Sequence, residues 1–142
     1  MQSQTQLADR LHSAAIHLLR NVRASDEQSG LSPARLSALS VLVFGGPVTI
    51  GALAAAEQVR PPTMTRLVDG LVDDGLASRE AHADRRSCLV RATGKGTKLL
   101  HAARRRRVAW LARGINALKA EERSALGRAA PILERVAATS RG

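Results

Sequence analysis

The chain has 142 residues, the length of a single domain, and 22 Lys and Arg against 12 Asp and Glu give it a net charge of +10. One Phe, one Trp and no Tyr argue against a protein that stacks single-stranded bases on aromatic rings. A single cysteine, Cys88, excludes an internal disulfide and a multi-cysteine metal site. No apolar run is long enough to span a membrane, and the polar N-terminus lacks a signal-peptide core, so we expect a cytoplasmic protein.

The charge is concentrated in the middle of the chain. Residues 60–107 carry 12 basic and 5 acidic side chains, whereas residues 1–59 carry four of each. Nineteen of the cations are arginines, whose planar guanidinium group donates paired hydrogen bonds to phosphates and base edges. This distribution is typical of a protein that binds a polyanion, although a solubilising surface has the same composition.

Three helices are predicted before residue 60. Residues 5–25 form the first, because apolar side chains recur there every three or four positions. Ser32 and Pro33 suit the N-cap and first position of the second helix. It runs to Phe44, with Leu36, Leu39, Val43 and Phe44 on its inner side. Thr49 can cap a short third helix, which faces inward with Ile50, Leu53 and Ala54.

A fourth helix begins near Pro61 or Pro62 and ends at Asp74-Gly75, where Gly75 suits a left-handed C-cap. Its predicted buried face consists of Met64, Leu67, Val68, Leu71 and Val72. The opposite face carries Pro62, Thr63, Arg66, Asp69, Gly70 and Asp73, with Thr65 at its shoulder. The Thr and Arg side chains of its N-terminal half can hydrogen-bond to base edges and phosphates.

A hairpin over residues 76–92 follows, with strands at Leu76–Glu80 and Cys88–Ala92 and a polar loop that contains Asp84, Arg85 and Arg86. Two more helices are predicted, one from residue 93 to about 118 and one from 121 to 138, the latter kinked at Pro131. The order predicts a mainly α fold with a small β-hairpin wing, a winged helix-turn-helix. The third and fourth predicted helices would form the helix pair. In such modules the second helix of the pair enters the major groove of DNA.

The sequence resembles the MarR family of bacterial transcription regulators over essentially its whole length. The resemblance rests on Leu31-Ser32-Pro33, on Pro62-Thr63-Met64-Thr65-Arg66-Leu67-Val68, and on Gly75-Leu76, Arg79, Asp84-Arg85-Arg86-Ser87 and Thr93-Gly94-Lys95-Gly96. It implies a homodimer joined by the first, fifth and sixth helices. It also implies a regulator, usually a repressor. Many members of the family release DNA when they bind a small molecule, which is often phenolic or anionic.

The resemblance assigns roles to three regions of the chain. Residues 1–30 and 93–142 would form the dimerisation region, and residues 31–92 the DNA-binding lobe, with its reader helix at about 61–74 and its wing at 76–92. Because a homodimer has two-fold symmetry, we expect its DNA partner to be a palindromic double-stranded operator. The half-sites of this operator should lie about 10 bp apart.

The resemblance places Arg86 in the minor groove, held by Asp84, and Thr63, Thr65 and Arg66 in the major groove beside Pro62. A narrow minor groove attracts arginine independently of any family, and Asp84 could equally form an Asx turn. Arg60 and Arg85 are expected to contact phosphates, which supply affinity rather than specificity. For Arg66 the alternative is a solvated surface charge.

His12 and Trp110 are candidates for an effector site, although both suit the dimer interface as well. The run Arg104–Arg107 favours a solvated face with one or two ion pairs within the dimer, with phosphate contact as the alternative. Cys88 could sense oxidants beside Arg85 and Arg86, but its place in the strand favours a small inward-facing residue.

Two other classes of function remain open. A winged-helix module that binds an acidic protein would show little sequence preference for DNA. An enzyme would need a closed pocket with convergent titratable groups, and we expect none, since His82, Asp84 and Cys88 lie on one hairpin. We expect no cofactor and no metal, because the four histidines lack ligand spacing and no phosphate-binding glycine loop is present.

Overall fold

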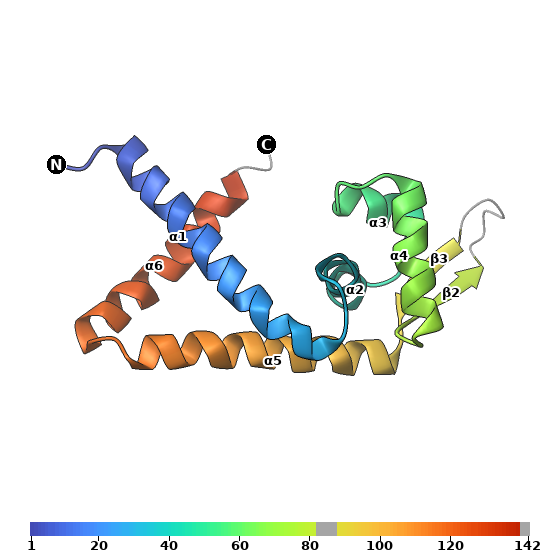
Figure 1. Ribbon diagram of the computed structural model, residues 1–142. Helices are drawn as coiled ribbons and strands as arrows, with labels where there is room; N and C mark the ends of the chain where they lie inside the picture. Colours follow the sequence, from blue (N-terminus) through green and yellow to red (C-terminus); the bar gives the residue numbers. More distant parts are fainter. Residues whose placement is uncertain (82–87, 140–142) are drawn as a thin grey trace. The chain divides into compact units, whose positions relative to one another are not determined.

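A computed structural model describes residues 1–81 and 88–139. The chain divides into two compact units, Met1–Arg107 and Val108–Gly142. The first unit begins with α1 (Gln4–Ala24), a 3₁₀ turn η1 (Ser25–Ser29) and α2 (Pro33–Gly45). Helix α5 (Gly94–Asn116) crosses the boundary between the units, and α6 (Ala120–Thr139) lies in the second. Figure 1 shows this order of elements along the chain.

The N-caps predicted for the second and third helices are confirmed. The Ser32 hydroxyl accepts a hydrogen bond from the N–H of Arg35 at 3.3 Å, and α2 begins at Pro33. The Thr49 hydroxyl accepts one from Ala52 at 3.1 Å, which starts α3 (Ile50–Ala56). These side chains satisfy backbone donors that have no partner within the first turn of a helix.

Helix α4 (Pro61–Asp73) is ended, as predicted, by Asp74 and Gly75, and the φ of Gly75 is +75°. Gly75 donates to the carbonyl of Val72 at 2.9 Å, and Leu76 donates to that of Leu71 at 2.8 Å. This pair of bonds is a Schellman motif, which needs a residue in the left-handed conformation and so favours glycine.

The predicted hairpin is confirmed as β2 (Ala77–Ala81) and β3 (Cys88–Ala92), which pair in antiparallel register from Ala77 opposite Ala92 to Ala81 opposite Cys88. The sequence did not predict β1 (Val48–Thr49), which pairs with β3 and completes a three-stranded sheet in the order β1-β3-β2. Two residues after a proline, of which the second is also the N-cap Thr49, are too few to show the alternation of a strand.

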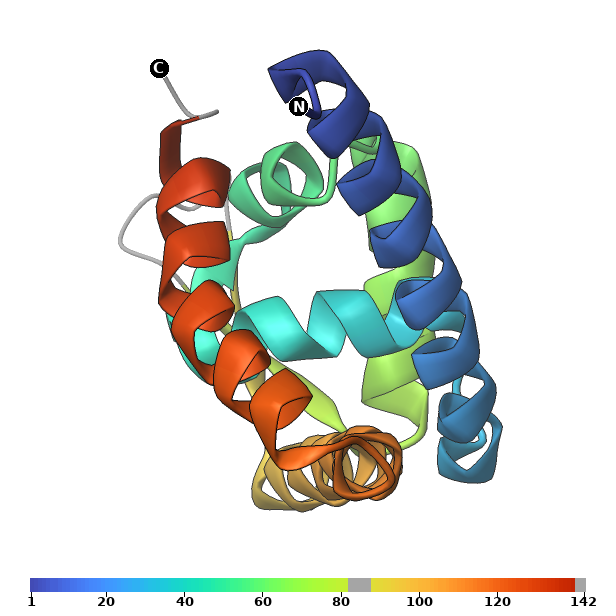
Figure 2. The same cartoon turned by 90° about the vertical axis from the view of Figure 1, so that its left-hand side faces the viewer.

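The core of the first unit lies where α2, α3 and α4 meet the sheet. In Figure 2, α2 runs crosswise to α4. The largest fully buried side chains are Leu39, Leu53, Met64, Val68, Leu71, Leu76 and Val90. The buried face predicted for α4 is therefore confirmed at Met64, Val68 and Leu71.

The inner position predicted for Phe44 is wrong, because its side chain is 58% exposed. Phe44 lies in the last turn of α2, where the core position is taken by Leu42 instead. Its ring meets His101 edge to face at 6.1 Å, and the guanidinium carbon of Arg104 lies 5.8 Å from its centroid. Helix α5 thus supplies its neighbours.

Helix α5 begins in close contact with the sheet. Gly96 is buried, and a Cβ atom added to it would lie 2.1 Å from the carbonyl oxygen of Leu76. The Thr93 N–H donates to that same carbonyl at 3.0 Å, and the Thr93 hydroxyl accepts from Gly96 at 3.1 Å. In the second unit α6 continues through Pro131 as one helix, so the proline does not divide it.

Candidate functional site

The N-terminal half of α4 presents a polar face outward. Pro62, Thr63 and Arg66 are exposed, and Arg60 is exposed at the N-cap position just before the helix. The opposite face is buried at Met64 and Val68, so α4 cannot turn these side chains away without exposing its apolar face. The face predicted for DNA recognition is therefore available to a partner.

Thr65 is less available than the sequence suggests. Its side chain is half-buried, and its hydroxyl donates a hydrogen bond to the carbonyl of Pro61 at 3.0 Å. This is the common back-bond of a helical threonine, which uses its proton within the helix. The methyl group and the oxygen lone pairs are what Thr65 can offer to a base.

The amino end of α4 has few backbone donors. Pro61 and Pro62 lack an N–H, which leaves Thr63 as the one backbone donor among the first three helical positions. Met64 already donates to the carbonyl of Arg60 at 3.1 Å. Phosphate contacts at this end would therefore depend mainly on side chains such as Arg60 and not on the N–H groups that usually bind anions there.

Asp69 on α4 and Asp74 at its C-cap each pair with an arginine from a neighbouring element. Asp69 accepts a hydrogen bond from the guanidinium of Arg79 on β2, and this bond raises the pKa of Arg79 above its ordinary value. Asp74 lies 3.6 Å from the guanidinium of Arg35 on α2. Arg35 crosses α4 over Gly70, where a Cβ atom would lie 2.4 Å from its Nη2.

The wing residues predicted to contact DNA lie outside the described part of the chain. Asp84, Arg85 and Arg86 belong to residues 82–87, between β2 and β3. The strands on either side are described, and Glu80 on β2 pairs with Arg91 on β3 at 2.6 Å. Cys88, the first residue of β3, is half-buried, and the alternative that it senses oxidants stays untested.

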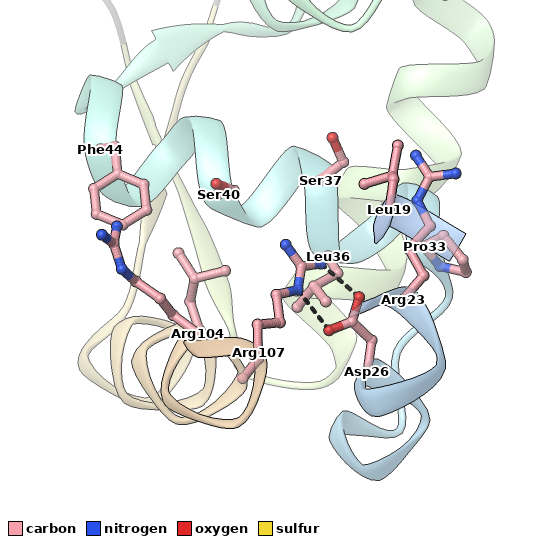
Figure 3. A pocket seen from close by; sticks show the side chains of 12 residues that line it. Leu19, Arg23, Asp26, Pro33, Leu36, Ser37, Ser40, Phe44, Arg104 and Arg107 are labelled. Atoms are coloured by element: carbon pink, nitrogen blue, oxygen red, sulfur yellow. Dashed lines mark hydrogen bonds and ion pairs between the residues drawn. The ribbon is translucent and has the colours of Figure 1, made fainter. Parts of the chain in front are cut away.

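A pocket of about 260 Å³ lies in the first unit between the end of α1, the outer side of α2 and α5 (Figure 3). Pro33, Ser37, Ser40 and Phe44 line it from α2 at spacings of three and four, which form one face of the helix. Its other lining residues are Leu19, Arg23, Asp26, Leu36, Leu100, Ala103, Arg104 and Arg107.

One wall of the pocket is an ion pair between Asp26 and Arg107. Arg107 donates to both carboxylate oxygens, at 2.7 Å and 2.5 Å, and these bonds raise its pKa above the ordinary value. The Asp26 side chain is 6% exposed, against 38% for Arg107. Asp26 neutralises the charge of Arg107. Among the described residues, the other two arginines that line the pocket, Arg23 and Arg104, form no ion pair with a carboxylate.

No motif in the sequence predicts this pocket. Asp26 stands in a polar stretch that predicts only a helix break, and Arg107 was expected to be solvated or to pair within a dimer. Neither His12 nor Trp110 lines the pocket: His12 is exposed on α1, and Trp110 is half-buried on α5 in the second unit. No pattern in the sequence links Asp26 to a residue 81 positions away.

Comparisons with known proteins agree with this architecture. The sequence model of the MarR family matches residues 29–87. HTH-type transcriptional regulators of Mycobacterium leprae and Mycobacterium tuberculosis are each 40% identical over 134 residues, which cover 94% of this chain and 94% of theirs. The chain belongs to the MarR family of transcriptional regulators. MarR-family regulators bind DNA and function as dimers.

Solved structures show that the fold of this MarR-family chain extends beyond the matched segment. A transcriptional regulator from Thermotoga maritima is 25% identical, with a TM-score of 0.81 over 96% of this chain and 97% of its own. A MarR family protein from Bacillus stearothermophilus has a TM-score of 0.80 at 24% identity, over 97% of this chain and 99% of its own. The likeness therefore includes the helices on both sides of the winged helix-turn-helix.

The described residues of this MarR-family protein contain no helix long and apolar enough to cross a membrane. Nor do residues 1–81 and 88–139 bring together three or more His, Cys, Asp or Glu side chains in a group that could hold a metal ion.

Proposed function

We propose that this MarR-family regulator is a homodimer that binds a palindromic duplex operator, with α4 in the major groove. It is a cytoplasmic protein and represses transcription. The observation that carries the proposal is the outward face of α4, where Thr63 and Arg66 are exposed one turn apart and Arg60 precedes them. A bidentate arginine is the commonest side chain to read guanine in the major groove. Arg60 would contact phosphate and set the register.

The apolar residues of α1 and α6 support dimerisation. Neither helix has a buried residue, and even large apolar side chains are exposed. On α1, Leu7, Leu11 and Leu18 are 49%, 42% and 50% exposed. On α6, Leu126, Ile132, Leu133 and Val136 are also exposed. Contiguous apolar side chains that a single chain leaves in water indicate an interface between proteins. The two-fold axis of the dimer would then present two α4 helices to the two half-sites.

The wing would add contacts in the minor groove. Residues 82–87 join β2 to β3 in the sequence and include Asp84, Arg85 and Arg86. We infer that Arg86 enters the minor groove with Asp84 orienting it, and that Arg85 contacts phosphate. The enhanced negative potential of a narrow minor groove favours arginine at that position.

The pocket beside α2 is the proposed effector site. Arg23 and Arg104 give it positive charge, while Leu19, Phe44 and Leu100 give it apolar surface. This combination suits a small molecule with one anionic group and an apolar ring, which would relieve repression by binding one conformation of the dimer more tightly than the other. His12 and Trp110 do not line this pocket, so their role in effector binding remains a prediction from the sequence alone.

The experiment that tests this function is a selection of binding sites from a random duplex DNA pool at near-physiological salt. A dimeric operator reader should recover a palindrome with half-sites about one helical turn apart. Recovery of no motif by a folded dimer would contradict the proposal. It would favour the other candidate, a winged-helix module that binds an acidic protein partner and shows little DNA specificity.

A further inference from the structure

An acidic residue lies on the face of α4 that the proposed function turns toward DNA. Asp69 is exposed and follows Arg66 by one turn of the helix. A carboxylate there repels the phosphates of DNA, so its presence needs a reason other than direct affinity. The structure offers such a reason: Arg79, on strand β2 of the wing, donates a hydrogen bond to the carboxylate of Asp69 on α4.

The bond joins two elements that the backbone connects only through a tight turn. Helix α4 ends at Asp73, and β2 starts at Ala77 after the Gly75 turn. Arg79 is the third residue of β2 and stands opposite Val90 of β3, which is fully buried. The position of its backbone is therefore fixed by the sheet, and its side chain reaches back to the middle of α4.

We propose that the Asp69–Arg79 bridge sets the orientation of the wing against α4, and that operator affinity depends on this orientation. The inference rests on the proposed function, because it requires α4 and the wing to bind one DNA site together. Arg79 is a positioning residue in this account: it acts through Asp69 and contacts no phosphate. In this account, the carboxylate of Asp69 lies on the DNA-facing side of α4 because it binds Arg79 and so orients the wing.

A double-mutant cycle tests the bridge. We would measure the Kd for the selected operator at several salt concentrations for Asp69→Asn, Arg79→Gln and the double variant. Each single variant should bind about fivefold more weakly, the scale of one exposed ion pair, and the double variant should be no weaker than the worse single one. The slope of log K against log salt should stay at the wild-type value, since no phosphate contact is lost.

The sign of the Asp69→Asn effect separates this account from electrostatics alone. Removal of a negative charge that merely repels DNA would tighten binding, and that result would overturn the inference. A fall of about one in the salt slope of Arg79→Gln would also overturn it, because it would show a lost phosphate contact. Asp69→Glu retains the acid and should restore wild-type affinity, which excludes a general loss of folding as the cause.

The wing supplies a matched control. Glu80 and Arg91 form a second exposed pair, but this pair joins β2 to β3 and not the wing to α4. The cycle Glu80→Gln, Arg91→Gln and their combination should show no coupling in operator affinity. Arg66→Ala completes the set: if it leaves the selected site unchanged, the proposed role of α4 fails, whereas a relaxed site with an uncoupled Asp69–Arg79 cycle rejects this inference alone.

Discussion

Asp26 and Arg107 join the turn after α1 to helix α5 through two hydrogen bonds, across 81 residues of sequence. Asp26 is the one charged side chain that is buried among the described residues. A buried carboxylate is costly unless it is paired, so this contact fixes η1 against α5 and closes one wall of the pocket.

The two partners should differ in their effect on stability. Arg107→Met leaves a buried carboxylate without its cation and should lower the free energy of unfolding by about 3 kcal/mol. Asp26→Asn leaves a partly solvated guanidinium and should cost about 1–2 kcal/mol. Urea denaturation of both variants measures this difference. Glu80→Gln, which breaks an exposed pair, should stay within about 1 kcal/mol, and equal effects of all three would contradict the assignment.

The contribution of Arg107 should not change with pH near neutrality. Because its folded pKa is raised, the stabilisation is complete below the pKa of unfolded arginine and is lost only as the pH rises above that value. Unfolding free energies of the wild type and Arg107→Met should therefore keep a constant difference from pH 7 to about pH 9. A difference that shrinks over this range would indicate another titrating partner.

Two glycines of α5 should respond in opposite ways to alanine. Gly96→Ala would place a Cβ atom against the backbone of Leu76 and should cost about 3 kcal/mol, because backbone cannot move aside as a side chain can. Gly94 has no atom within 4 Å of its Cβ position, so Gly94→Ala should be neutral or stabilising by up to about 1 kcal/mol. Thermal melts of the two variants test the contrast.

Arg66 and Arg60 should separate specificity from affinity. Arg66→Ala should relax the base preference at one operator position, at a loss of about 1–3 kcal/mol of discrimination. Arg60→Ala should weaken all sequences alike and reduce the salt slope by about one. Repeated site selection and salt titrations with each variant would show this. A preserved operator sequence with Arg66→Ala would place another residue in the groove.

The apolar face of α1 should control the oligomeric state. Leu18→Glu puts a charge on that apolar face and should produce a monomer, with operator affinity lowered at least about 100-fold because the half-sites are no longer linked. Light scattering after gel filtration measures the mass. Asp9→Ala, on the opposite face of the helix, is the control and should remain dimeric. A dimeric Leu18→Glu protein would move the interface elsewhere.

The pocket should respond to an aromatic anion through Arg104. We expect millimolar benzoate to weaken operator binding by the wild type, and Arg104→Gln to need about tenfold more benzoate for the same effect. Arg105→Gln removes the same charge from the next residue, which does not line the pocket, and should respond as the wild type does. Equal responses of both variants would show that benzoate acts at another site.

Local patterns in the sequence determined the winged helix-turn-helix. The caps at Ser32 and Thr49, the buried face of α4 and the turn at Gly75 each follow from residues close together in the chain. Capping, helical periodicity and left-handed turns depend on short-range sterics and hydrogen bonds, which a sequence displays directly. The face offered by Thr63 and Arg66 could be predicted for the same reason.

The tertiary structure alone decided which distant residues meet. The Asp26–Arg107 pair, the bridge from Asp69 to Arg79 and the exposed ring of Phe44 depend on how separate elements pack. The two-residue strand β1 likewise exists only because β3 lies beside it. Long-range pairing is set by the fit of whole elements in three dimensions, and no spacing within one helix or strand encodes it.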